Sequence, residues 1–174
     1  MKKCICFVLI ILLPVFSLLG KDVTPDIKNT TGNIFYLGMS IDQVEDILGK
    51  PKKIYKEKFI DEKPEFDEVF WEYETGIVFS FYYGDRNVRK IKLSTNQYSI
   101  EYRGFCIIPR ITTLQDIENI FGKGYEIENT SPHRILEYYF DKKQKHPFIS
   151  DIIQFYFNND ICTMILIFED TEFI

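Results

Sequence analysis

The chain has 174 residues and a mass of 20.7 kDa, enough for one domain or for two smaller repeats around a shared core. Hydrophobic residues make up 45% and charged residues 27%, a composition that indicates a globular protein and excludes a disordered chain. The net charge of -5 offers no excess of cations for phosphate groups, so we expect no nucleic-acid partner.

Residues 1–20 have the pattern of an export signal. Lys2 and Lys3 give a positive start, and residues 4–19 are almost continuously apolar. As a helix this run would span roughly 24 Å, short of the ~30 Å hydrocarbon core of a membrane. We therefore predict an exported protein, periplasmic or extracellular. A retained membrane anchor is the alternative, and membrane contact is expected only in that case.

Two segments 73 positions apart share one pattern, Ser40–Lys50 and Thr113–Lys123. Each begins with a hydroxyl residue suited to cap a helix and continues with apolar residues at helical spacing. The apolar positions are 41, 44, 47 and 48, and then 114, 117, 120 and 121. Gly49 and Gly122 follow, where a helix end favours glycine. The pattern predicts two short amphipathic helices.

Four short strands are predicted after each helix, because alternating apolar residues are separated by turn residues. The predicted strands are 53–59, 69–74, 77–83 and 88–93, and then 125–128, 134–140, 152–157 and 161–168. These elements predict an α+β fold of two tandem repeats, each a short helix followed by about four antiparallel strands, with the helices on one face of a shared sheet. The predicted divisions are a linker at 21–33, a first repeat at 34–103 and a second at 104–174.

The segment from Gly38 to Pro51 resembles a motif of the SmpA/OmlA-like outer-membrane lipoproteins, GMS-x-x-x-V-x-x-x-LG-x-P. Two such units in tandem resemble the β-lactamase inhibitory protein group. The resemblance implies helices packed on one side of an antiparallel sheet and a binding role without catalysis. The lipoproteins carry a cysteine just after the apolar run, and this chain has none there.

Catalytic and metal-binding chemistry finds little support in the sequence. His133 and His146 each lie beside a proline in a polar loop, and no C-x-x-C pair or nucleophile motif is present. We expect no enzyme activity, no metal and no cofactor. Cys106 and Cys162 are the two cysteines beyond the apolar run; they could form a disulfide in an oxidising compartment or be buried thiols.

Strand alternation sorts the predicted sheet into two faces. The predicted core face, toward the helices, has these residues: Trp71, Tyr73, Ile77, Phe79, Phe81, Tyr83, Ile91, Leu93, Leu136, Tyr138, Ile153, Phe155, Phe157, Met164 and Leu166. The other face mixes tyrosine with both charge signs, and the alternation also places Thr163 and Ile165 on it. The candidate binding residues on it are Glu72, Glu74, Tyr82, Lys90, Glu137, Tyr139, Gln154 and Tyr156.

Such a face suits recognition of a protein partner, although an ordinary solvated sheet face has a similar composition. We therefore predict an exported, non-catalytic protein that binds a protein partner through the open face of its sheet. The alternatives are a secreted enzyme inhibitor, which is a special case of the same idea, and a hydrolase with an unrecognised site.

Overall fold

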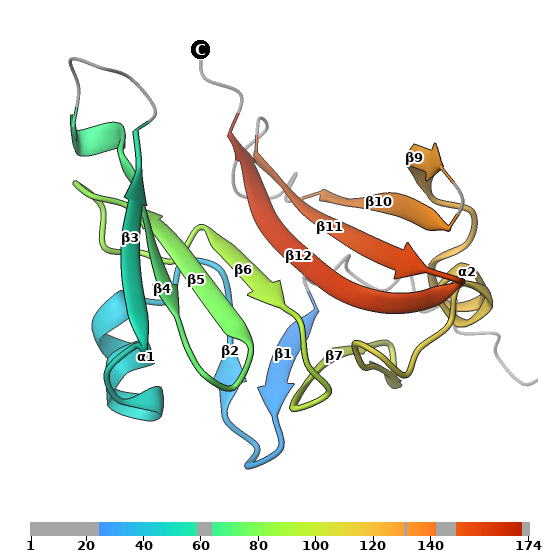
Figure 1. Ribbon diagram of the computed structural model, residues 1–174, viewed down its shortest axis with the longest axis horizontal. Helices are drawn as coiled ribbons and strands as arrows, with labels where there is room; N and C mark the ends of the chain where they lie inside the picture. Colours follow the sequence, from blue (N-terminus) through green and yellow to red (C-terminus); the bar gives the residue numbers. More distant parts are fainter. Residues whose placement is uncertain (1–24, 59–63, 131, 142–148, 172–174) are drawn as a thin grey trace, which may run out of the picture.

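The computed structural model describes residues 25–58, 64–130, 132–141 and 149–171 (Figure 1). Within these ranges the chain forms twelve β-strands, two α-helices and one short 3-10 helix, η1 (Pro64–Phe66). The predicted export signal, residues 1–20, lies outside the described residues.

The largest element is an eight-stranded antiparallel sheet with the strand order β3-β4-β5-β6-β12-β11-β10-β9. The first four strands are β3 (Lys53–Glu57), β4 (Glu68–Glu72), β5 (Ile77–Tyr82) and β6 (Lys90–Leu93). The other four are β9 (Tyr125–Thr130), β10 (His133–Asp141), β11 (Ile149–Asn158) and β12 (Ile161–Thr171). β6 pairs with β12, so the strands after the first helix and those after the second form one continuous sheet.

A second, four-stranded antiparallel sheet has the order β2-β1-β7-β8. Its strands are β1 (Asp26–Asn29), β2 (Ile34–Phe35), β7 (Tyr98–Tyr102) and β8 (Phe105–Ile107). The ring of Phe35 in β2 lies 5.5 Å from that of Phe79 in β5, so this sheet packs against the large one. Buried residues of both sheets and both helices form one hydrophobic cluster.

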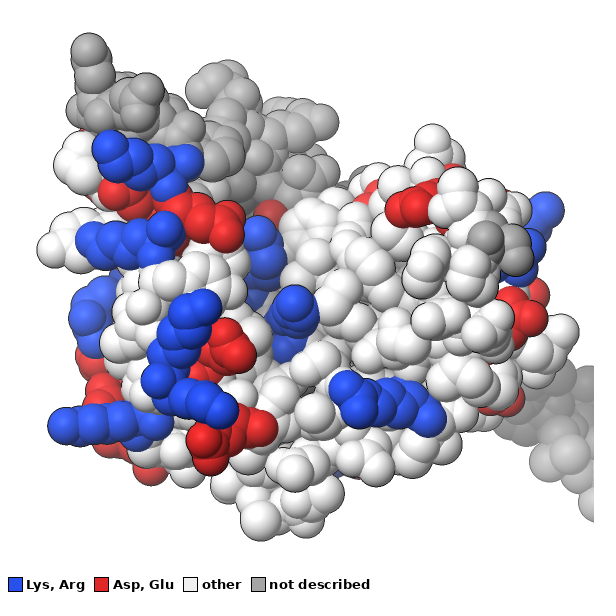
Figure 2. Space-filling view, viewed as in Figure 1, with Lys and Arg blue, Asp and Glu red and all other residues white. Residues whose placement is uncertain are grey.

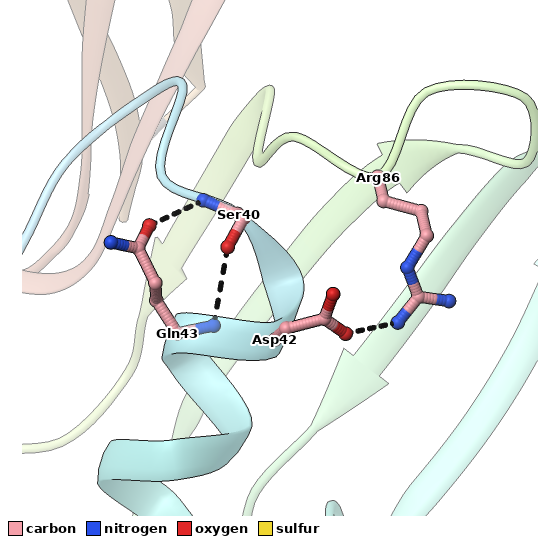
Figure 3. Close-up of polar contacts among 4 residues, drawn as sticks. All are labelled: Ser40, Asp42, Gln43 and Arg86. Carbon is pink, nitrogen blue, oxygen red and sulfur yellow. Dashed lines mark hydrogen bonds and ion pairs between the residues drawn. The ribbon is translucent and has the colours of Figure 1, made fainter.

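The first helix, α1 (Ile41–Leu48), begins at the predicted cap (Figure 3). The backbone N–H of Gln43 donates to the Ser40 hydroxyl, and the Ser40 N–H donates to the Gln43 side chain at 3.0 Å. Arg86 donates to Asp42 in the first turn at 2.5 Å. The two contacts between Ser40 and Gln43 satisfy backbone donors that a helix N-terminus would otherwise leave unpaired.

The second helix, α2 (Leu114–Phe121), is capped in the same way by Thr113 and Asp116. Both helices end at the predicted glycines, Gly49 with φ 75° and Gly122 with φ 82°. Their ψ values of -160° and -167° place them in a region of backbone space that is essentially restricted to glycine. The predicted helices and helix ends are therefore confirmed.

The predicted fold class is wrong. The protein is mostly β, with two antiparallel sheets and only two α-helices of eight residues each in its described part, rather than two tandem helix-plus-sheet repeats. Two such short helices offer too little apolar surface to cover one face of an eight-stranded sheet. The four-stranded sheet covers the rest of that face. Part of it comes from the expected linker at 21–33, where β1 buries Ile27 to 1% exposure.

The predicted alternation of β12 is also wrong over most of its length. Ile165 is fully buried in the core, and Leu166 lies on the opposite face between Lys92 of β6 and Gln154 of β11. The cause is a β-bulge: Tyr156 pairs with Met164 and Phe157 pairs with Cys162, so one extra residue, Thr163, lies between the two pairs. Met164 and Leu166 therefore leave the core, where the sequence had placed them, and Phe168 lies on the same face as these two residues.

Candidate functional site

One face of the eight-stranded sheet is turned away from α1, α2 and the four-stranded sheet, and we call it the open face. The pairing register assigns these described residues to it: Lys53, Tyr55, Glu57, Glu68, Phe70, Glu72, Val78, Ser80, Tyr82, Lys90, Lys92, Ile135, Glu137, Tyr139, Ile152, Gln154, Tyr156, Met164, Leu166 and Phe168. We call the part on β3–β6 the first half and the part on β10–β12 the second half.

The first half is organised around a charged cluster. The Lys90 ammonium lies 2.9 Å from the carboxylate of Glu68, and the Ser80 hydroxyl donates to the same carboxylate at 2.5 Å. Ser80 is buried, and Glu68 and Lys90 are half-buried. The cluster therefore neutralises its own charge within the sheet face.

Aromatic rings extend this half toward the β3 edge. Tyr55 stacks on Phe70 with 4.8 Å between ring centroids and 3° between ring planes. Tyr82 packs edge-on against Phe66 of η1 at 6.3 Å, and the guanidinium of Arg89 lies 5.0 Å from the Tyr82 ring. Tyr82 is thus half-buried, with neighbours on two sides.

A hollow of about 280 Å³ opens on the first half and reaches β12. Its lining residues are Tyr55, Glu57, Phe70, Val78, Ser80, Lys90, Lys92 and Leu166. The hollow thus combines an apolar wall with two ammonium groups and one carboxylate.

The second half is organised around a chain of hydrogen bonds. The Tyr156 hydroxyl donates to the Gln154 side-chain oxygen at 2.8 Å, and the Gln154 amide donates to the Glu137 carboxylate at 2.6 Å. The Tyr139 hydroxyl donates to the other oxygen of Glu137. Glu137 is only 7% exposed, whereas Tyr139 is 58% exposed. Burial, followed by the negative charges of Glu137 and Glu128, raises the pKa of Tyr156 above its ordinary value.

The charges divide unevenly between the halves. In the view of Figure 2, Lys, Arg, Asp and Glu gather over β3–β6, and the surface over β11 and β12 is mainly uncharged. Among open-face side chains described on β10–β12, Glu137 carries the one charge, and its two hydrogen-bond donors are neutral. The apolar side chains of Met164, Leu166 and Phe168 lie beside this network.

The structure places seven of the eight predicted binding residues on the open face. Glu72, Tyr82 and Lys90 are in the first half, and Glu137, Tyr139, Gln154 and Tyr156 are in the second. Their binding role stays a prediction.

Glu74 is the exception. It follows the end of β4 in an exposed turn, and its carboxylate lies 3.3 Å from the ammonium of Lys52. Tyr83, predicted in the core, follows the end of β5 and is 58% exposed. Both errors come from strands that end earlier than the sequence suggests.

Sequence reasoning missed Tyr55 and Phe70 as site residues. Phe70 has the same alternation as Glu72, so strict alternation along β4 would have found it. Tyr55 follows from pairing, because it lies directly opposite Phe70 in β3.

The possible disulfide between Cys106 and Cys162 is not formed. Both are free thiols: Cys106 is exposed in β8, and Cys162 is buried in β12. Burial raises the pKa of the Cys162 thiol to about 12, so this group is protonated at neutral pH.

Two other kinds of site were sought in the described ranges. No group of three or more His, Cys, Asp and Glu side chains in them could hold a metal ion. In the same ranges, neither helix has the length and apolar character needed to cross a membrane.

Comparison with known protein families gives no match, and comparison with curated proteins gives none either. Two solved structures are similar over most of this chain. One is an extracellular protein containing a SCP domain from Bacillus anthracis str. Ames, with a TM-score of 0.45, 10% identity and coverage of 77% of this chain. The chain spans 44% of that protein's length. The other is a proposed beta-lactamase inhibitor protein from Streptococcus mutans, with a TM-score of 0.26, 18% identity and coverage of 78% of this chain and 86% of the other.

Proposed function

We propose that this is an exported, non-catalytic protein that binds a protein partner through the open face, with the second half as the main contact area. The observation that carries the proposal is the network of Tyr139, Glu137, Gln154 and Tyr156. Hydrogen bonds hold the two tyrosine hydroxyls in place, so their rings would lose little conformational freedom when a partner binds. Preorganised tyrosines are effective anchors at protein interfaces for this reason.

The composition of β12 also supports protein binding. Met164, Leu166 and Phe168 lie on the open face, outside the hydrophobic core cluster. An ordinary solvated strand carries polar residues on its outer face. Adjacent apolar side chains on such a face favour contact with another molecule, since burying them removes apolar surface from water.

Two further observations support the non-catalytic role and the export of the protein. The Cys162 thiol, with a pKa raised to about 12, is unsuited to act as a nucleophile. The positive and then apolar residues 1–20 favour export.

The test is affinity capture with the full chain immobilised and exposed to an envelope extract and to culture medium of the source organism. Captured proteins are identified by peptide mass. We expect a protein retained by the wild type and by the control Tyr36→Ala, and at least tenfold less of it with Tyr139→Ala/Tyr156→Ala. Tyr36 is an exposed tyrosine outside the open face.

Equal capture by the double variant would contradict the proposal, as would the absence of any captured protein. The captured protein can be an enzyme whose activity falls when this chain binds. In that case this chain is an inhibitor of that enzyme. That outcome would specify the proposed function further.

A further inference from the structure

The two lysines of β6 lie in the same hollow but in different electrostatic settings. Lys90 is neutralised by Glu68 at 2.9 Å and lies between Ser80 and Phe168 in the register. Lys92 is exposed and forms no ion pair with any carboxylate in the described part of the chain. The hollow therefore contains one compensated ammonium group and one uncompensated ammonium group.

The surroundings of Lys92 are apolar on both sides. Its direct neighbours in the register are Val78 of β5 and Leu166 of β12, and Phe70 lies farther along the hollow. Apolar walls lower the local dielectric and exclude competing water when a ligand covers them, which strengthens an ion pair formed there. A carboxylate that enters with an apolar group beside it would satisfy both features.

The carboxylate in the lining of the hollow, Glu57, disfavours one orientation of such a ligand. Glu57 is on β3, at the edge of the sheet, whereas Lys92 is on β6, next to the centre. An incoming negative charge is repelled at the β3 end and attracted at the β6 end.

We propose that the hollow receives an acidic side chain of the protein partner, with its carboxylate on the Lys92 ammonium and a neighbouring aliphatic side chain against Phe70, Val78 and Leu166. This inference rests on the proposed function, because it specifies the chemistry that the open face recognises. Lys92 is the residue that selects the charge of the partner.

The test uses a displayed library of random loop peptides selected on the immobilised full chain. With the wild type we expect peptides that share an Asp or Glu next to an aliphatic residue. With Lys92→Glu we expect this preference to vanish and Lys or Arg to replace it. Changing the acidic residue of a selected peptide to its amide should weaken binding to the wild type at least tenfold, and should change binding to Lys92→Gln less than threefold.

The matched control is Lys123→Glu, which changes the net charge equally at an exposed site outside the open face. It should select the same peptides as the wild type. Thermal unfolding of each variant checks that it is folded before selection. The inference is overturned if Lys92→Glu selects the same acidic peptides, or if the wild type selects no acidic position or no peptide.

Failure of this inference can be distinguished from failure of the proposed function. Binding that is lost with Tyr139→Ala/Tyr156→Ala but does not respond to Lys92→Glu overturns the role of Lys92 and leaves the open face as the binding surface. Binding that responds to neither change overturns both.

Discussion

The two halves of the open face compensate their carboxylate groups in different ways. In the first half the carboxylate of Glu68 is paired with Lys90, and further charges surround them. In the second half the carboxylate of Glu137 accepts hydrogen bonds from Tyr139 and Gln154, which are neutral. Covering charged groups with a partner costs desolvation energy, and covering rings and aliphatic groups costs little. The comparison therefore favours the second half as the main contact area and leaves the first half to determine charge specificity.

The largest expected effect concerns the alternation of β12, on which the apolar character of the second half depends. Ile165→Ala should lower the free energy of unfolding by about 2–5 kcal/mol, because Ile165 is fully buried. Leu166→Ala should lower it by about 1 kcal/mol or less, because Leu166 lies on the open face. Chemical denaturation measures both values, and the opposite ranking would show that the bulge is misplaced and that Leu166 belongs to the core.

The two carboxylates provide the next comparison. Glu137→Gln should cost about 1–3 kcal/mol, because it replaces a buried charged acceptor and disrupts its two hydrogen bonds. Glu68→Gln should cost about 0.2–1 kcal/mol, because its ion pair is half exposed.

The salt dependence of these two stability costs separates the two carboxylates further. The cost of Glu68→Gln should shrink as salt is raised to about 1 M, since ions screen a partly exposed pair, and the cost of Glu137→Gln should not. Denaturation curves at low and high salt give both numbers. If the two costs respond to salt equally, the difference between the halves is not electrostatic.

Elements were predicted correctly from the sequence where the interactions that define them are between residues close together in the chain. The helices were predicted because caps, apolar stripe and terminal glycine all lie within about eleven residues of one another. The four-stranded sheet was missed because β1, β2 and β8 have two to four residues each and carry too short a pattern. Strand β7 did carry a signal, since its alternate residues Tyr98, Ile100 and Tyr102 are buried.

The candidate site was predictable only in part, for a related reason. Alternation assigned Tyr82, Glu137 and Tyr156 to the open face correctly. It failed in β12 because a bulge shifts the alternation by one residue and has no clear local signature at Thr163. The Tyr139–Glu137–Gln154–Tyr156 network depends on the register between two strands, which one strand alone does not determine.

The helix ends allow a matched test of the two helices. Gly49→Ala and Gly122→Ala should each lower the free energy of unfolding by about 1 kcal/mol, because both glycines have positive φ. A Cβ at either position would meet no atom within 4 Å, so the cost would be due to the backbone conformation and not to a clash. An unchanged melting temperature for either variant would contradict the positive φ at that helix end.

Two tyrosines connect those helix ends to the sheet, and their removal should have a small effect. The hydroxyl of Tyr73 donates to the carbonyl of Gly49 at 3.2 Å, and that of Tyr138 donates to the carbonyl of Gly122 at 2.9 Å. Burial, assisted by nearby acidic residues, raises the pKa of each to about 12. Tyr73→Phe and Tyr138→Phe should each cost about 0.5–1 kcal/mol at neutral pH.

The pH dependence of stability checks the same two groups. Because their pKa is higher in the folded state than the ordinary value of 10, their contribution is complete below pH 10 and is lost as the pH rises toward 12. Each Phe variant should therefore lose less stability than the wild type over this range. An identical decline in all three proteins would contradict the raised pKa values.

The central claim is that the open face binds a protein partner, and the most direct measurement is the Kd of the captured partner for wild type and for Tyr82→Ala/Tyr156→Ala. Both tyrosines lie on the open face, one in each half. The double variant should stay folded, with a loss of about 0.5–1 kcal/mol. Its Kd should rise at least tenfold, which corresponds to roughly 1.4 kcal/mol, while Tyr36→Ala leaves it unchanged. A folded double variant with the Kd of the wild type would contradict the account.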